Sequence, residues 1–242
     1  MLERDAIYAK PLESVAGFTF DQAVARVFPD MINRSVPGYT QIVAYLGLWA
    51  ARYVRPNSTV YDLGCSLGAS TLAIHQGMTQ TGTKIIAVDN APAMLERFEQ
   101  TLQTVPDSES IELRLANLQD VMIDNASLVV LNFTLQFIEP AQRDTIIGRI
   151  YNGLNPGGLL ILSEKIIFPT NEQTERFIDI HHDFKRANGY SDLEVAQKRT
   201  SLENVLIPET IDSSRERMLR AGFDSAEAWF QAFNFMSMVA IK

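Results

Sequence analysis

The sequence has little of what marks several large classes of protein. It holds one cysteine, Cys65, which excludes an internal disulfide and a zinc site built from several thiolates. No apolar run approaches the roughly 18 residues that a membrane helix needs. Glu3, Arg4 and Asp5 are charged where a signal peptide is apolar. We therefore expect a soluble, cytoplasmic protein that contacts no membrane.

Positive charge is also scarce. The 242 residues include 21 Lys and Arg against 29 Asp and Glu, which gives a net charge of −8. A chain this acidic does not attract nucleic acid through its overall field, so we expect no direct nucleic-acid binding. An anionic substrate has to be met by a local cluster of basic side chains. With 46% hydrophobic residues, the chain has the length and composition of a single domain spanning residues 1–242.

Strands and helices alternate through the middle of the chain. Short apolar runs that end in polar residues or glycine predict strands, and amphipathic runs between them predict helices. The predicted strands are Thr59–Leu63, Lys84–Val88, Ile111–Leu115, Ala126–Phe133 and Leu159–Ser163, and the predicted helices are Ala69–Met78, Pro92–Thr104 and Gln142–Leu154. This alternation predicts an α/β fold, a doubly wound and mostly parallel sheet with helices on both faces.

The two flanks of this alternating region have a different pattern. We expect residues 1–56 to be an N-terminal helical segment, in which Thr40–Val54 is the clearest amphipathic helix. Residues 168–206 are a polar, largely helical insertion that the sheet does not need, and we expect them to cap the carboxyl edge of the sheet. The last residues predict a helix over Pro208–Ala221 and an antiparallel hairpin of Ala226–Phe233 and Phe235–Ile241.

Polar residues and glycines follow several of the predicted strands. They are Asp62, the turn Gly64–Gly68, Asp89 with Asn90, Asn117 with Leu118, and Asn132. Ligands of open α/β sheets bind at the carboxyl ends of the strands, so these residues predict one site. A carboxylate such as Asp89, about 20 residues after the glycine turn, is placed to accept hydrogen bonds from both hydroxyls of a ribose. Each feature alone also fits a tight turn, but together they indicate an adenosine-type ligand.

The glycine turn argues against a dinucleotide. A dinucleotide fold needs the pattern G-x-G-x-x-G around a pyrophosphate, and here Ser66 takes the position of the second glycine. The segments Asp62–Gly68 and Leu154–Gly158, together with Asp89, instead resemble the nucleotide motifs of class I S-adenosylmethionine-dependent methyltransferases. That resemblance implies a Rossmann-like sheet that ends in an antiparallel C-terminal hairpin.

Longer strings across nearly the whole chain resemble a narrower family, the carboxy-S-adenosyl-L-methionine synthases. They are Phe28–Ile32, Arg34–Tyr39, Tyr61–Ser66, Leu131–Phe137, His181–Tyr190, Gln197–Arg199, Trp229–Gln231 and Phe233–Phe235. The resemblance implies an enzyme that converts S-adenosyl-L-methionine and prephenate to carboxy-S-adenosyl-L-methionine and phenylpyruvate, without a metal. It also implies a homodimer, and a second enzyme, a tRNA carboxymethyltransferase, that uses the product at the wobble uridine.

The same resemblance implies the residues of the site. Those expected to hold the S-adenosyl ligand are Tyr39, Gly64, Cys65, Ser66, Asp89, Asn90, Asn117, Leu118, Asn132 and Arg199. Arg199 is also the expected catalytic residue, as the ligand of the new carboxylate. Where the family commonly has Asp-Ile, this chain has Asn117 and Leu118. We expect weaker adenine discrimination from this change, because an asparagine accepts hydrogen bonds only through its carbonyl oxygen.

A cluster of basic residues has both a functional and a structural interpretation. Lys185, Arg186, Lys198 and Arg199 form a basic cluster in an acidic chain, which suits a dianion such as prephenate but also fits a solvated helix face. At the level of function, the alternatives are an ordinary small-molecule methyltransferase and a non-catalytic protein that binds the same ligand.

Three residues with reactive side chains are expected to be structural. His181 and His182 point about 100° apart on a helix, so both cannot easily hold one metal ion. Cys65 lies inside the glycine turn, where a buried and inert thiol is expected.

Overall fold

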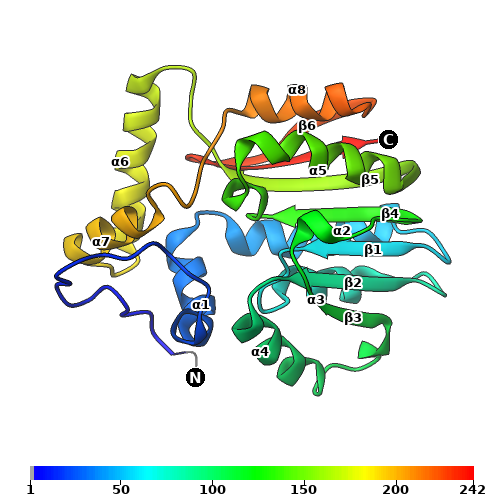
Figure 1. The fold of residues 1–242 in the computed structure, drawn as a ribbon, viewed down its shortest axis with the longest axis horizontal. Helices are drawn as coiled ribbons and strands as arrows, with labels where there is room; N and C mark the ends of the chain where they lie inside the picture. The colour runs from blue at the N-terminus through cyan, green and yellow to red at the C-terminus, as the bar shows by residue number, and fades with distance from the viewer. Residues whose placement is uncertain (1–2) are drawn as a thin grey trace.

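The computed structural model describes residues 3–242, in which a seven-stranded sheet carries helices on both faces (Figure 1). The strand order is β3-β2-β1-β4-β5-β7-β6, with the first five strands parallel and β7 antiparallel to both of its neighbours. The doubly wound, mostly parallel sheet with an antiparallel C-terminal hairpin is confirmed. The strands are β1 (Thr59–Leu63), β2 (Lys84–Asp89), β3 (Ile111–Leu115), β4 (Ala126–Asn132), β5 (Leu154–Lys165), β6 (Ser225–Ala232) and β7 (Phe235–Ile241).

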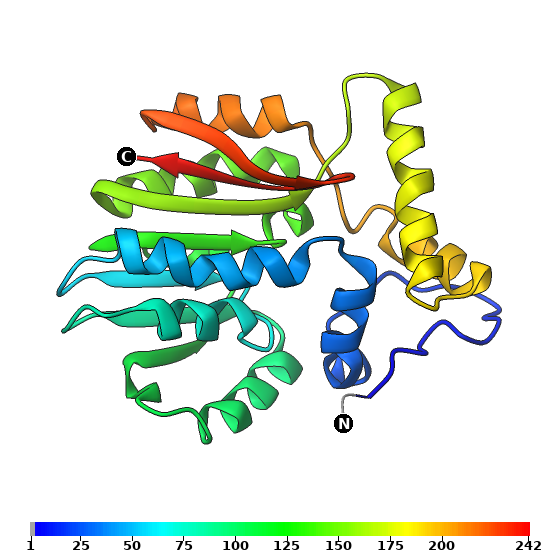
Figure 2. The same cartoon turned by 180° about the vertical axis from the view of Figure 1, so that it is seen from behind.

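The helices that cover the sheet build one core layer on each face. On one face, α5 (Pro140–Gly153) and α8 (Ile211–Ala221) bury Ile147 and Met218. On the other face, toward the viewer in Figure 2, α2 (Tyr39–Tyr53) and α3 (Ala69–Gly77) bury Leu46 and Ile74 against the sheet. The strands β1 and β4 are buried on both faces, which explains their nearly continuous apolar sequences. The helix α4 (Pro92–Leu102) packs on the same face as α2 and α3. Three short turns of 3-10 helix complete the elements of this region: η1 (Ser108–Ser110), η2 (Leu118–Asp120) and η3 (Leu135–Phe137).

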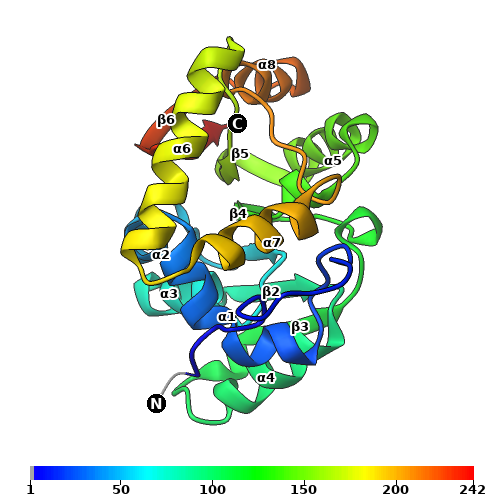
Figure 3. The ribbon, with the colours of Figure 1, turned by 90° about the vertical axis from the view of Figure 1, so that its left-hand side faces the viewer.

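Three helices lie beyond the carboxyl ends of the parallel strands. They are α1 (Gln22–Ser35), α6 (Asn171–Ala187) and α7 (Asp192–Leu202). Figure 1 shows them to the left of the sheet, and in Figure 3 they lie in front of it. We call these three helices the cap. Within residues 3–242, no helix is both long enough and apolar enough to cross a membrane.

Some element boundaries differ from the sequence prediction. The helical spacing starts at Phe18, but α1 begins at Gln22, because the Asp21 carboxylate accepts a hydrogen bond from the Val24 amide at 2.9 Å and caps the helix there. The strand β5 is longer than the predicted Leu159–Ser163, because the chain before it pairs with the start of β4 across a register shift. At its carboxyl end β5 also runs two residues beyond the predicted Ser163, to Lys165, because it pairs there with β7.

Candidate functional site

A cavity of about 460 Å³ lies between the carboxyl ends of the strands and the cap. Its walls come from the turn after β1, the ends of β2, β4 and β5, and the helices α1, α2, α6 and α7. The predicted site residues that line it are Tyr39, Gly64, Cys65, Ser66, Asp89, Asn90, Leu118 and Asn132. Asn117 and Arg199 are exposed and lie outside the cavity lining.

The glycine turn after β1 has the backbone conformation that its sequence requires. Gly64, Ser66 and Gly68 have φ angles of 86°, 51° and 84°, a left-handed conformation that glycine adopts without strain. A side chain at Gly64 would also overlap that of Thr134. The turn is tied to the end of β2, because the amides of Gly64 and Cys65 both donate to the Val88 carbonyl, at 2.8 and 2.9 Å. These contacts hold Gly64, Cys65 and Ser66 in the cavity lining.

Asp89 is the carboxylate at the centre of this wall. One oxygen accepts from the Ser66 amide at 2.8 Å and the other from the Ala91 amide at 2.9 Å. Burial raises the pKa of this carboxyl, although these backbone hydrogen bonds act in the opposite direction. Each oxygen keeps further acceptor capacity toward the cavity. The group is thus oriented to receive two hydroxyls from a sugar.

Asn132, at the end of β4, has an acceptor without a partner. Its side-chain nitrogen donates to the Ser70 hydroxyl at 2.9 Å, while its buried Oδ1 has no hydrogen-bond partner. Buried polar atoms are nearly always satisfied, so an unpartnered oxygen on a residue of the cavity lining makes Asn132 a candidate contact for a ligand donor.

The adenine side of the site departs from the sequence expectation. The Asn117 carbonyl oxygen accepts from the Asn90 amide at 3.1 Å, and its own amide lies 3.4 Å from Asp120. Asn117 therefore orients Asn90, which lines the cavity, while Leu118 supplies an apolar surface. Of Asn90, Asn117 and Leu118, only Asn90 and Leu118 line the cavity.

Three lysines also line the cavity, one from the edge of the sheet and two from the cap. Lys165 ends β5, Lys185 lies in the last turn of α6, and Lys198 lies on α7. Burial lowers the pKa of Lys185 to about 8 and that of Lys198 to about 7. Of the basic cluster predicted in the insertion, Arg186 points outward and forms ion pairs with Asp183 and Asp192.

Sequence reasoning missed Lys165, although a signal for it exists. It comes directly after the predicted strand Leu159–Ser163 and Glu164, at the same edge as the other predicted residues. The rule that selected Asp89 and Asn132 therefore also selects Lys165. The pKa of its ammonium group is lowered by burial and by the nearby Arg199 guanidinium. Arg199 thus lies close enough to the cavity to affect a residue that lines it.

The residues expected to be structural have structural contacts. His181 is buried, and its Nε2 lies 2.8 Å from the Ser35 carbonyl oxygen, although its ring also lines the cavity. Burial lowers its pKa far below the usual value, so the ring is neutral. Cys65 is 4% exposed, and burial raises the pKa of its thiol. The thiol is therefore protonated and a poor nucleophile. In residues 3–242, no three His, Cys, Asp or Glu side chains gather as metal ligands.

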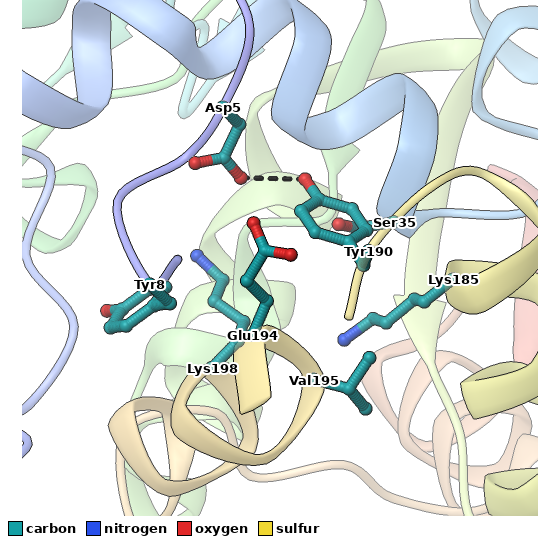
Figure 4. A pocket seen from close by; sticks show the side chains of 8 residues that line it. All are labelled: Asp5, Tyr8, Ser35, Lys185, Tyr190, Glu194, Val195 and Lys198. Carbon is teal, nitrogen blue, oxygen red and sulfur yellow. Dashed lines mark hydrogen bonds between the residues drawn. The ribbon is translucent and has the colours of Figure 1, made fainter. Parts of the chain in front are cut away.

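The N-terminal segment holds the cap in place over the cavity. The Tyr190 hydroxyl donates to Asp5 at 2.6 Å, as Figure 4 shows, and the Arg34 guanidinium lies 3.9 Å from the centre of the Tyr190 ring. Gln197 on α7 donates to the carbonyls of Tyr8 and Lys10, both at 2.9 Å. These contacts fix α7, and with it Lys198, relative to the start of the chain.

Comparison with solved structures supports the fold. An O-methyltransferase family protein from Burkholderia thailandensis aligns with a TM-score of 0.63 and 17% identity over 95% of this chain and 65% of that chain. Magnesium protoporphyrin IX methyltransferase from Synechocystis aligns with a TM-score of 0.61 and 14% identity, covering 88% of this chain and 87% of that chain. At these identities the likeness concerns the fold alone.

Comparison with protein families and curated relatives is more specific. A family model described as a methyltransferase domain matches residues 60–158. Carboxy-S-adenosyl-L-methionine synthase of Trichlorobacter lovleyi is 58% identical, with 98% of both chains covered. The proteins of the same name from Aliivibrio fischeri and Klebsiella pneumoniae are 52% and 50% identical over all of this chain and over 100% and 98% of their own. The chain therefore belongs to the carboxy-S-adenosyl-L-methionine synthase family of methyltransferase-like enzymes.

Proposed function

We propose that the protein converts S-adenosyl-L-methionine and prephenate to carboxy-S-adenosyl-L-methionine and phenylpyruvate. The observation that carries this proposal is the identity of 50 to 58% over almost the whole chain with relatives named for the carboxylated product. The cavity supports it, because one wall suits a nucleoside and the opposite wall is cationic. The product then serves a separate tRNA carboxymethyltransferase that modifies the wobble uridine.

The proposed reaction balances without a metal. Prephenate loses its ring carboxylate as carbon dioxide and its hydroxyl as hydroxide, and the ring becomes aromatic. Hydroxide takes a proton from the methyl group of the sulfonium, forming water and an ylide. The ylide carbon attacks carbon dioxide, and the new carbon–carbon bond gives the carboxylated sulfonium. The chain has to hold both substrates together and keep bulk water away, which a cavity covered by the cap allows.

The S-adenosyl ligand is proposed to lie along the sheet side of the cavity. In this arrangement Asp89 binds the ribose hydroxyls, Asn132 accepts from the ligand ammonium, and Leu118 lies against the adenine. The glycine turn contributes Gly64 to the cavity lining, and the missing side chains at Gly64 and Gly68 leave room for Thr134 and Phe98 to pack against the turn. The remaining residues expected to bind this ligand, Tyr39, Cys65, Ser66 and Asn90, line the same cavity.

Arg199 is proposed to bind the new carboxylate. It neighbours Lys198, which lines the cavity, but its own side chain is exposed. The guanidinium therefore acts after a change of rotamer or of the position of α7. The protein is further proposed to act as a homodimer, and its excess of acidic residues supports a role without direct contact to tRNA.

The test is a reaction with both substrates, followed by mass spectrometry. The proposal predicts S-adenosylmethionine heavier by one carbon dioxide, formed together with phenylpyruvate. Omission of prephenate, or its replacement by phenylpyruvate, is the control and should abolish the product. An ordinary methyltransferase, favoured by the methyltransferase domain match, would instead release S-adenosylhomocysteine and methylate an acceptor. S-adenosylhomocysteine as the main product would contradict the proposal.

A further inference from the structure

The three cavity lysines have no acidic partner. Among residues 3–242, no carboxylate oxygen lies within 4.0 Å of the ammonium groups of Lys165, Lys185 or Lys198. Lys185 is 7% exposed, and its ammonium has no hydrogen bond to the chain. The Lys198 ammonium lies 3.1 Å from the Met31 sulfur, 3.5 Å from the centre of the Phe18 ring and 5.6 Å from that of the Tyr8 ring. Lys185 is buried and Lys165 and Lys198 are half-buried. Charges withdrawn from water are normally paired, so this arrangement lacks a counterion within contact distance.

The acidic side chains nearest to these lysines are bound to other donors. Figure 4 shows Lys185 and Lys198 entering a small pocket that Asp5 and Glu194 also line. Asp5 accepts from the Tyr190 hydroxyl at 2.6 Å and from a backbone amide. Glu194 accepts from the amide and the hydroxyl of Ser191, both at 2.8 Å, in the capping box of α7. Neither carboxylate forms an ion pair with the lysines, although the charge of Asp5 offsets part of the cost of burying Lys185 and Lys198.

The surroundings of the lysines lower the pKa of their ammonium groups. Burial lowers the pKa of both Lys185 and Lys198, and repulsion lowers each further, from Lys165 on Lys185 and from Lys185 on Lys198, while the charge of Asp5 acts in the opposite direction on both. An anionic ligand would reverse both effects, because it replaces lost hydration and offsets the repulsion. Three positive charges around one cavity exceed what a single carboxylate needs.

We propose that Lys165, Lys185 and Lys198 form the binding site for a small dicarboxylate, the second substrate of the reaction. This inference rests on the proposed function, under which the dicarboxylate is prephenate. The site distinguishes a dianion from a monoanion by charge, and it holds the dianion across the cavity from Asp89 and Asn132. The decarboxylated product, phenylpyruvate, has one carboxylate fewer and binds more weakly, which favours its release.

Binding without turnover tests this site. Prephenate and phenylpyruvate are titrated calorimetrically into the protein saturated with S-adenosylhomocysteine, which has no methyl group to react. The wild type should bind prephenate more tightly than phenylpyruvate. Lys185→Met and Lys198→Met should each raise the Kd for prephenate about 10- to 100-fold, since each removes one charged hydrogen-bond donor. Lys84→Met, at the exposed start of β2, is the matched control and should change nothing.

Two other outcomes would overturn the assignment. An equal loss of S-adenosylhomocysteine affinity would mean that the lysines bind the carboxylate of the methionine portion. A lower Tm together with loss of every ligand would mean a structural role. The proposed site instead predicts an unchanged or higher Tm, because each variant removes a buried charge without a partner.

The same variants separate this inference from the proposed function. If the wild type forms no carboxylated product, the proposed function fails, but preferential binding of the dianion still supports the lysine site. If the wild type and both lysine variants form the product with the same KM for prephenate, the lysine site fails and the proposed function stands.

Discussion

Asp89 is the residue on which the proposed binding of a nucleoside depends most directly. Its carboxylate is held by two backbone amides, those of Ser66 and Ala91, so its orientation does not depend on the ligand. Such preorganisation lowers the entropic cost of binding. Asn132 has the complementary role in the proposed site, since its buried carbonyl oxygen has no hydrogen-bond partner.

The first prediction concerns Asp89→Asn. Loss of the charge and of one acceptor should weaken S-adenosylmethionine, S-adenosylhomocysteine and the carboxylated product alike, by about 1.5–3 kcal/mol for a charged hydrogen bond. Isothermal titration calorimetry measures the three affinities. Glu99→Gln, an exposed carboxylate on α4, is the control. Unchanged affinities would place the ribose elsewhere.

The second prediction concerns Arg199→Ala. If the guanidinium meets the new carboxylate, the variant should lose affinity for carboxy-S-adenosyl-L-methionine by about 2–5 kcal/mol, the usual cost of removing one partner of a desolvated charge pair. Binding of S-adenosylmethionine should change much less. Arg186→Ala, exposed and ion-paired on α6, should leave both affinities unchanged. Equal losses for the two ligands in Arg199→Ala would contradict the assigned role.

The third prediction concerns the pH dependence of stability. Asp62 is fully buried; one oxygen accepts from the Thr71 hydroxyl at 2.6 Å, and the other has no partner. Burial raises its pKa from 3.8 to about 7. Between these values the folded state holds a proton that the unfolded state has lost. The contribution of Asp62 to the free energy of unfolding is therefore full below about pH 4 and is lost as the pH rises to about 7.

Asp62→Asn tests that dependence, because the amide stays neutral and keeps an acceptor for Thr71. Urea unfolding at both ends of the range should show that the wild type loses more stability than the variant as the pH rises. Asp224→Asn, on an exposed carboxylate, should retain the slope of the wild type. Equal slopes in wild type and Asp62→Asn would show that another group is responsible.

At the scale of elements, the cap depends on contacts between distant parts of the chain. Helix α7 carries Lys198 and Arg199, and it is held by Gln197, which is 7% exposed. Gln197 donates to two carbonyls of the N-terminal segment and accepts from the Leu12 amide at 2.8 Å. The segment and the helix therefore support each other above the cavity.

The fourth prediction is that Gln197→Ala loosens this part of the cap. The lost hydrogen bonds should speed hydrogen exchange at the Leu12 amide, because that amide loses its acceptor. The affinity of the protein for prephenate should also fall, because α7, which carries Lys198, is then less well positioned. Thr200→Ala, on the exposed side of the same helix, is the control. Unchanged exchange at Leu12 would mean that the segment is held by its other contacts.

At the scale of the whole molecule, the sequence predicts the sheet and one wall of the cavity well. Apolar strands buried on both faces and glycine or acidic residues at their ends leave a local pattern, and these residues do meet at one edge. The other wall depends on contacts such as Asp5 with Tyr190, 185 positions apart, which no local pattern encodes. The direction of Arg199 is also decided by tertiary structure, since the helix turns it away from the side where Lys198 lines the cavity.

The most direct test of the proposed reaction follows the carbon atom of the ring carboxylate of prephenate. Prephenate labelled with carbon-13 in the ring carboxylate is incubated with the protein and S-adenosylmethionine in buffer that contains unlabelled bicarbonate. The account predicts that the label appears in the carboxyl group of the modified sulfonium and is absent from phenylpyruvate, because carbon dioxide moves between the substrates inside the cavity. An unlabelled carboxylated product, or recovery of the label as bicarbonate alongside S-adenosylhomocysteine, would contradict it.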